Sequence, residues 1–207
     1  MTPIESHPMP EGFLPENTLC LIMGTFPPKE FVKAAHFFFY PSPQNHFWNR
    51  MENIVPGVRL KKTQKKLQDV SEAQNVLDKM EFCKQQGIGF LDVFTRVSRR
   101  EGTNEDTNLE NVEDVISNGK LLWILQATPS IQRICCTYSL AFKTLKSGIS
   151  QIPGCKISEV GETSFQAKFT DTERVIDVYL LYPATRSRHR GKEKDRQYRS
   201  LIFLRSN

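Results

Sequence analysis

The chain has 207 residues, of which 39% are apolar and 25% are charged, and its net charge is +5. This length and composition predict one folded domain, residues 1–207, with a substantial buried core. No apolar run reaches the roughly 18 residues that cross a membrane, and the sequence does not open with the basic and apolar regions of a secretory signal. We therefore expect a cytoplasmic monomer that binds no membrane.

Strands and helices alternate along the first half of the sequence. Short apolar runs bounded by Gly and Pro predict buried strands, and apolar residues at helical spacing predict amphipathic helices. In order, the predicted elements are a strand over 19–23, a short helix over 45–55, a longer helix over 61–86 and a strand over 87–94.

The second half continues this alternation. Thr107 and Glu110 have the spacing of a capping box, so we expect a helix to begin there and to run through Val115 towards Leu125. The later elements are a strand over 131–138, a helix over 139–147, strands over 156–160, 165–169 and 175–182, and a final basic helix with Tyr198, Leu201 and Ile202 on one face. Together they predict a three-layer α/β/α sandwich with a mostly parallel sheet.

Positive charge is concentrated at the C-terminus. From Arg186 onwards the sequence has eight basic and two acidic residues, so the net charge of this segment is +6 and that of the first 185 residues is −1. The eight are Arg186, Arg188, Arg190, Lys192, Lys194, Arg196, Arg199 and Arg205. Such a patch indicates a polyanion as partner, and a solvated helix face is the alternative.

Several chemistries are excluded by residue type. The sequence contains no G-x-x-x-x-G-K-[ST], G-x-S-x-G or H-E-x-x-H motif, and its four His are not spaced as metal ligands. The five cysteines form neither a disulfide framework nor a CxxC pair, so we expect reduced, mostly buried thiols. A hydrolase with this sequence would work without a metal or cofactor.

Ligands of open α/β sheets bind beyond the carboxyl ends of the strands, which directs attention to the segments after Met23, Phe90, Tyr138 and Leu181. The first of these loops is followed by an aromatic segment that leads to Asn45. An aromatic ring beside a side-chain amide can stack a flat base and hold a water or a base edge. As an alternative, Asn45 caps the helix that follows it.

Four blocks occur in the order seen in the uracil-DNA glycosylase superfamily, which the sequence resembles. They read GTFPP, YPSPQNHFW, GIGFLDV and LLYPATRSRHR. The second and third are most similar to the mismatch-specific thymine/uracil enzymes, whereas GTFPP and the Asp of GIGFLDV are similar to the hypoxanthine-DNA glycosylase branch. The resemblance implies a four-stranded parallel sheet between helices and hydrolysis of an N-glycosidic bond, with the base flipped out of the duplex.

The resemblance also implies roles for individual residues. Tyr40 matches the ring on which the base stacks, Asn45 matches the catalytic Asn of the hypoxanthine branch, and Asp92 falls where uracil-reading members keep an Asn. We assign catalysis to Asn45 and Asp92, and base binding to Gly24, Thr25, Phe26, Tyr40 and Asp92.

The loop after the last strand matches the loop that pinches the DNA strand in this superfamily. Its expected DNA-binding residues are Pro183, Thr185, Arg186, Ser187, Arg188 and Arg190. Arg188 falls at the residue that fills the hole left by the flipped base, and a simple phosphate contact is the alternative.

Phe26 departs from the superfamily pattern, because the mismatch-specific enzymes carry a water-activating Asn there. The Asp and the last-loop His of the classical uracil enzymes are also missing, so catalysis would rest on Asn45. The leading hypothesis is a metal-independent monofunctional DNA glycosylase of base excision repair that acts on hypoxanthine, xanthine or uracil in duplex or single-stranded DNA. A catalytically inactive nucleic-acid-binding member and a small-nucleotide-binding protein are the alternatives.

Overall fold

The computed structural model describes residues 3–34, 36–42, 44–60, 69–100, 105–184 and 191–203. Its larger sheet has six strands in the order β3-β2-β6-β9-β8-β7. The strands are β2 (Cys20–Gly24), β3 (Ile88–Asp92), β6 (Arg133–Cys136), β7 (Cys155–Gly161), β8 (Ser164–Phe169) and β9 (Arg174–Leu180). Among them, β3, β2, β6 and β9 are parallel, whereas β9, β8 and β7 pair antiparallel.

The expected four parallel strands are therefore present, but the sheet is larger and mixed. Two residues connect β7 to β8, and four connect β8 to β9. Connections this short join only antiparallel neighbours, because a parallel pair needs a crossover of a dozen or more residues. The strands predicted over 156–160 and 165–169 thus extend the parallel sheet as two antiparallel strands at one edge.

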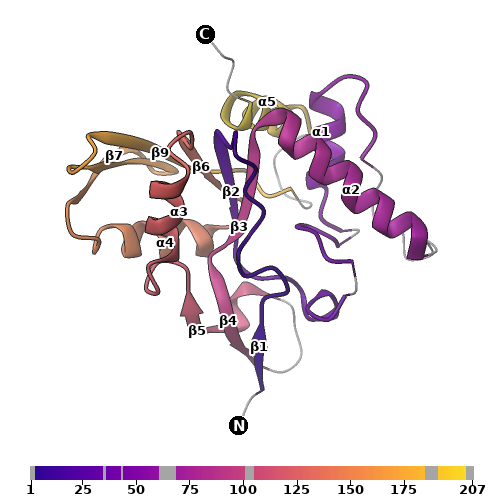
Figure 1. The fold of residues 1–207 in the computed structure, drawn as a ribbon, viewed down its shortest axis with the longest axis horizontal. Coiled ribbons are helices and arrows are strands. Elements are labelled where there is room, and N and C mark those ends of the chain that lie inside the picture. Colours follow the sequence, from indigo (N-terminus) through magenta and orange to yellow (C-terminus); the bar gives the residue numbers. More distant parts are fainter. Residues whose placement is uncertain are drawn as a thin grey trace.

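Helices cover both faces of the sheet (Figure 1). They are α1 (Phe47–Ile54), α2 (Asp69–Gln86), α3 (Lys120–Ala127), α4 (Ser139–Ile149) and α5 (Gly191–Ile202). Successive side chains of β2 enter different cores: Leu21 and Met23 pack with α3 and α4, whereas Cys20 and Ile22 pack with α1, α2 and α5. The two cores confirm the expected three-layer arrangement of helices and sheet.

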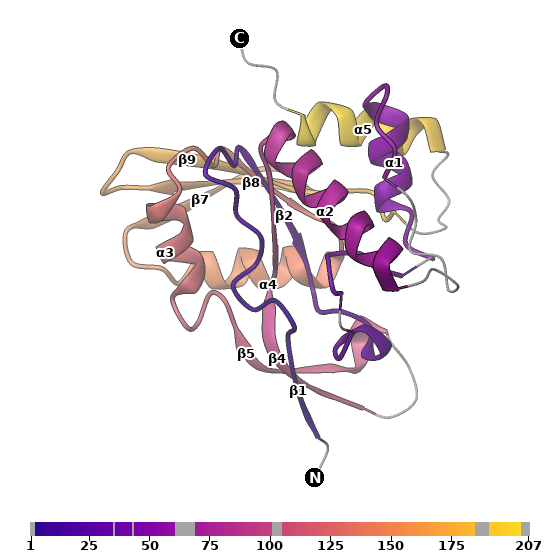
Figure 2. The same ribbon diagram turned by 45° about the vertical axis from the view of Figure 1, so that its right-hand side comes forward.

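A second, antiparallel sheet in the order β1-β4-β5 lies at one end of the molecule (Figure 2). It comprises β1 (Ile4–Ser6), β4 (Phe94–Arg99) and β5 (Leu109–Asp114). The capping-box prediction was wrong, since the residues after Thr107 form β5 and the helix begins only at Lys120. Pairing of β5 with β4 outweighs the local signal, and Gly119, with φ of 77°, separates the turn from α3.

The cysteines agree with the prediction of reduced, mostly buried thiols. All five cysteines are free, and four of them, Cys20, Cys83, Cys135 and Cys136, are buried.

In the part of the chain that the structure describes, no helix has both the length and the apolar character needed to span a bilayer.

Candidate functional site

A cavity of about 390 Å³ opens at the carboxyl ends of β2 and β3. This volume falls in the range of small-molecule sites, roughly 300–1,000 Å³. The residues assigned from sequence to catalysis and base binding all line it: Gly24, Thr25, Phe26, Tyr40, Asn45 and Asp92. The remaining lining residues are Pro27, Pro28, Glu30, Phe37, Pro41, Ser42, Gln44, Glu105, Asp106 and Tyr138.

Of the predicted DNA-binding residues, the structure describes only Pro183. Pro183 is described but does not line the cavity. Thr185, Arg186, Ser187, Arg188 and Arg190 lie outside the described residues.

Asp92 ends β3 and is held by His7, which follows β1. Pairing of β1 with β4 brings the two segments together, and the His7 N–H donates to the carbonyl of Thr95 at 2.9 Å. His7 Nδ1 accepts from the N–H of Met9 at 2.9 Å, so the ring proton is on Nε2 and is donated to Asp92 Oδ2 at 3.1 Å. The imidazole is enclosed by the rings of Phe26, Phe37 and Phe39.

Gly24 allows the Asp92 carboxylate to lie against the end of β2. A Cβ at position 24 would stand 2.4 Å from Asp92 Oδ1 and 3.3 Å from the Tyr40 hydroxyl. The first distance is far below van der Waals contact, and Asp92 is already fixed by His7. The glycine of GTFPP is therefore a spatial requirement of this site.

Tyr40 has the left-handed backbone conformation, with φ of 56°, which is uncommon for a residue other than glycine. Its ring stacks on Phe47 at a centroid distance of 4.7 Å, and its hydroxyl lies 2.9 Å from Thr137 Oγ1. Burial and the charge of Asp92 raise the pKa of Tyr40 well above its usual value. Tyr40 is thus a neutral, fixed aromatic wall of the cavity.

Asn45 is held at both ends of its carboxamide. Its Oδ1 accepts from the N–H of Phe47 at 2.9 Å, and its Nδ2 donates to the Tyr138 hydroxyl at 3.2 Å. The predicted N-cap is thus displaced by one residue: His46 is the N-cap of α1 and makes no side-chain capping bond. Asn45 lies just before it, accepts from the first N–H of the helix and lines the cavity. Burial raises the pKa of Tyr138 to about 12, so this hydroxyl is neutral at physiological pH.

Asp106 was not singled out from the sequence, where it lies in a charged loop without a recognisable motif. It begins a short 3₁₀ helix, Asp106–Asn108, and its Oδ1 accepts from the Thr25 hydroxyl at 2.8 Å. Burial raises the pKa of Asp106 above its usual value, the hydrogen bond from Thr25 opposes this, and the charge of Asp92 adds to it.

The described lining is strongly acidic. Four carboxylic side chains line the cavity, those of Glu30, Asp92, Glu105 and Asp106, and none of the described lining residues is Lys or Arg. Arg99 contacts this wall without lining the cavity: its Nη2 donates to the Pro27 carbonyl at 2.9 Å and also pairs with Glu5. Among the described residues, no group of three or more His, Cys, Asp or Glu is arranged to hold a metal ion.

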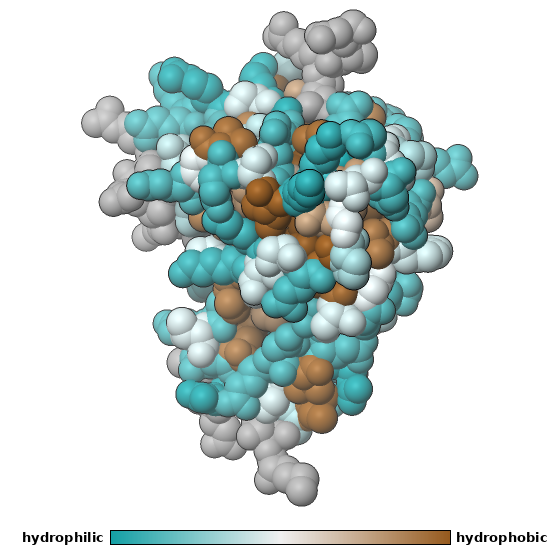
Figure 3. Space-filling view, turned by 90° about the vertical axis from the view of Figure 1, so that its left-hand side faces the viewer, coloured by the Kyte–Doolittle hydropathy of each residue, from teal (hydrophilic) through white to brown (hydrophobic). Residues whose placement is uncertain are grey.

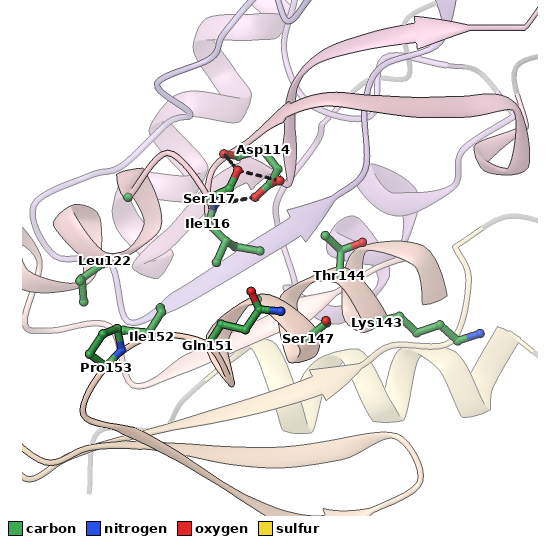
Figure 4. Close-up of a pocket in the computed structure, with 12 residues that line it drawn as sticks. Asp114, Ile116, Ser117, Leu122, Lys143, Thr144, Ser147, Gln151, Ile152 and Pro153 are labelled. Atoms are coloured by element: carbon green, nitrogen blue, oxygen red, sulfur yellow. Dashed lines mark hydrogen bonds between the residues drawn. The ribbon is translucent and has the colours of Figure 1, made fainter.

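Two further cavities lie on the α3 side and contain none of the predicted residues. The larger, about 700 Å³, lies beside α4 and the turn after β5 (Figure 4). There Asp114 accepts hydrogen bonds from Ser117 and from the N–H of Ile116, and Lys143 extends away from the other labelled side chains. The smaller, about 360 Å³, includes Leu125, Phe169 and Arg174. On the face shown in Figure 3, apolar side chains are interspersed with polar ones.

No family model matches the chain, and no curated protein matches it either. Among solved structures, the chain is similar to the solution NMR structure of "a putative Uracil DNA glycosylase from Methanosarcina acetivorans". The TM-score is 0.56 at 19% sequence identity, and the match covers 96% of this chain and 98% of that chain. The likeness shows a shared fold.

Proposed function

We propose that the protein is a DNA glycosylase-like enzyme that hydrolyses the N-glycosidic bond of a deaminated base flipped out of DNA. The observation that carries this proposal is the convergence of Tyr40, Asn45 and Asp92 in one cavity at the carboxyl ends of the parallel strands. The fold shared with the Methanosarcina acetivorans structure supports it.

The charges of the cavity favour a base over a nucleotide as the group that enters. A phosphate inside would face Asp92 and Asp106 with no described Lys or Arg on the wall. A flipped base brings only a neutral ring into the cavity, while its phosphates stay outside with the rest of the DNA. In this proposal the basic C-terminal segment would bind that backbone. Its predicted DNA-binding residues are Pro183, Thr185, Arg186, Ser187, Arg188 and Arg190.

The residues present can support hydrolysis without a covalent intermediate. Breaking the C1′–N bond places positive charge on the sugar and negative charge on the base. The carboxylates around the cavity would stabilise the cationic sugar. Asn45 is fixed by Phe47 and Tyr138, so its remaining lone pair and N–H would orient water or substrate without an ordering cost.

Asp92 favours purine products of deamination in this proposal. Its Oδ2 accepts from His7, and a carboxylate offers a base only acceptors. Hypoxanthine and xanthine present ring N–H donors to such a group, whereas the O4 of uracil would face it with like polarity. Tyr40 would provide the face on which either purine stacks.

A catalytically inactive nucleic-acid-binding protein is the second candidate. Phe26 is buried against His7 and cannot activate water, and both polar atoms of the Asn45 carboxamide already have protein partners. Incubation with duplexes that contain uracil, hypoxanthine, xanthine or a G·T mismatch, with a chelator present, distinguishes the two. Abasic sites in the hypoxanthine or xanthine duplex support the enzyme, whereas binding without abasic sites in any duplex supports the inactive protein.

A further inference from the structure

A glycosylase that uses Asn45 alone would lack a basic group for its water. A carboxamide oxygen can orient a water but does not take its proton. Phe26 stands where the mismatch-specific enzymes that the sequence resembles carry a water-activating Asn. Its ring lies in the aromatic cluster around His7. The structure supplies a carboxylate beside this position from a different segment of the chain.

That carboxylate is Asp106, which is anchored to Thr25, the neighbour of Phe26. The 2.8 Å hydrogen bond from Thr25 fixes Oδ1, and both residues line the cavity. In the described part of the structure, Oδ2 of Asp106 accepts no hydrogen bond. One oxygen therefore holds the side chain in place, and the other is available to a water.

The other two polar groups that were assigned to catalysis are less suited to take a proton. Asp92 has its Oδ2 bonded to His7 and its Oδ1 lodged against Gly24. Asn45 has its Oδ1 bonded to the N–H of Phe47. Asp106 combines a basic group, a fixed orientation and an oxygen without a partner among the described residues.

We propose that Asp106 is the general base that orients and deprotonates the attacking water, an inference that rests on the proposed glycosylase function. As the water oxygen bonds to C1′, one water proton passes to Asp106 Oδ2. The C1′–N bond breaks, and its electron pair leaves with the base. The base takes a proton from solvent, and Asp106 later releases its own proton to solvent. The net change is the addition of one water across the glycosidic bond.

Burial supports this role, because it raises the pKa of Asp106. The hydrogen bond from Thr25 and the charge of Arg99 lower this pKa, the charge of Asp92 raises it, and the net direction is upward. The carboxylate is therefore a stronger base than an exposed Asp. Asp106 must be ionised to act, so the rate of base release should rise with pH through its pKa. The acid limb of the profile should lie above the ordinary Asp value of about 3.9.

The test measures single-turnover base release, on the duplex from which the wild type releases its base fastest. A duplex with hypoxanthine opposite cytosine is tried first. Asp106→Asn keeps the size of the side chain and an acceptor for Thr25, and Asp106→Ser is measured in parallel. Both variants should be slower by on the order of a hundredfold or more and should lose the acid limb, with duplex affinity unchanged. Glu110→Gln is the matched control, because it removes one charge from an exposed ion pair with Arg100. It should behave like the wild type.

Two results would overturn the proposal in different ways. If the wild type releases base and the folded Asp106 variants release it equally fast with the same pH profile, only the assignment of Asp106 fails. If the wild type binds the duplexes and releases no base from any of them, the proposed function fails and the assignment fails with it.

Discussion

His7 Nε2 and Asp92 Oδ2 form a buried hydrogen bond of 3.1 Å although the two residues are 85 positions apart in the sequence. The bond fixes which oxygen of Asp92 faces His7 and which lies against Gly24 in the candidate base site. It therefore determines the polarity that the end of β3 presents to the cavity.

Asp92→Asn should shift the preference among bases towards uracil. The Nε2–H of His7 still needs an acceptor, so the new carboxamide should present its oxygen to His7 and its NH₂ to the cavity. That donor can pair with a uracil carbonyl, which the carboxylate cannot. We expect the ratio of kcat/KM for uracil over hypoxanthine to rise about tenfold or more, the value of one hydrogen bond of roughly 1.5 kcal/mol. An unchanged ratio would show that Asp92 does not read the base.

His7→Phe should destabilise the fold because it leaves the Asp92 carboxylate buried without its partner. The new ring retains the packing against Phe26, Phe37 and Phe39. The free energy of unfolding, measured by urea denaturation, should fall by about 1–3 kcal/mol. The double variant with Asp92→Asn should recover part of this loss, since a neutral amide is less costly to bury than a carboxylate. Equal losses in the single and double variants would contradict the proposed coupling.

Asn45→Ala should reduce base release and stability together. The variant loses the acceptor for the N–H of Phe47, which should cost about 1 kcal/mol of unfolding free energy. It also loses the fixed carboxamide of the cavity, so the single-turnover rate should fall by at least tenfold, with little change in duplex affinity.

Asn118→Ala is the matched control for this loss of stability. Asn118 Oδ1 accepts from the N–H of Lys120 at 3.0 Å, the same two-residue contact at the start of another helix, and Asn118 does not line the candidate cavity. It should lose comparable stability and retain full activity. If both variants were as active as the wild type, Asn45 would only stabilise the start of α1.

The sequence predicted those parts of the site that lie at the ends of strongly patterned elements. The apolar runs of β2 and β3 located Gly24 and Asp92 at the carboxyl edge of the sheet, and the helical spacing of α1 located Asn45 just before its first turn. His7 was not predictable in this way, because its position depends on the pairing of β1 with β4.

Asp106 and β5 show the same limit of local patterns. Asp106 reaches the cavity through a hydrogen bond to Thr25 across 81 positions, and no local signal encodes that contact. The capping-box spacing of Thr107 and Glu110 favoured a helix, but β4 was available as a pairing partner and the segment became a strand. Long-range contacts thus decided both cases: a side-chain hydrogen bond placed Asp106, and backbone pairing with β4 made the segment after Thr107 a strand.

The basic C-terminal segment yields the last prediction, which concerns salt dependence. In α5 the apolar face is docked as expected, with Tyr198 and Ile202 buried, whereas Lys192, Arg196 and Arg199 are exposed. The triple change Arg186, Arg188 and Arg190 to Ala alters residues just before this helix. If all three contact phosphate, the slope of log K against log salt should become shallower by roughly 2–3, at about 0.9 per phosphate on duplex DNA.

The control for this triple variant removes the same formal charge elsewhere. Lys146, Lys156 and Lys168 lie on α4, β7 and β8, away from α5, and their change to Ala should leave the slope unchanged. Affinity of all three proteins is measured by fluorescence anisotropy on undamaged and hypoxanthine-containing duplexes. Because phosphate contacts carry no sequence information, the arginine variant should lose affinity for both duplexes alike. A slope identical to that of the wild type would place these arginines away from the DNA and would support the alternative of a solvated basic surface.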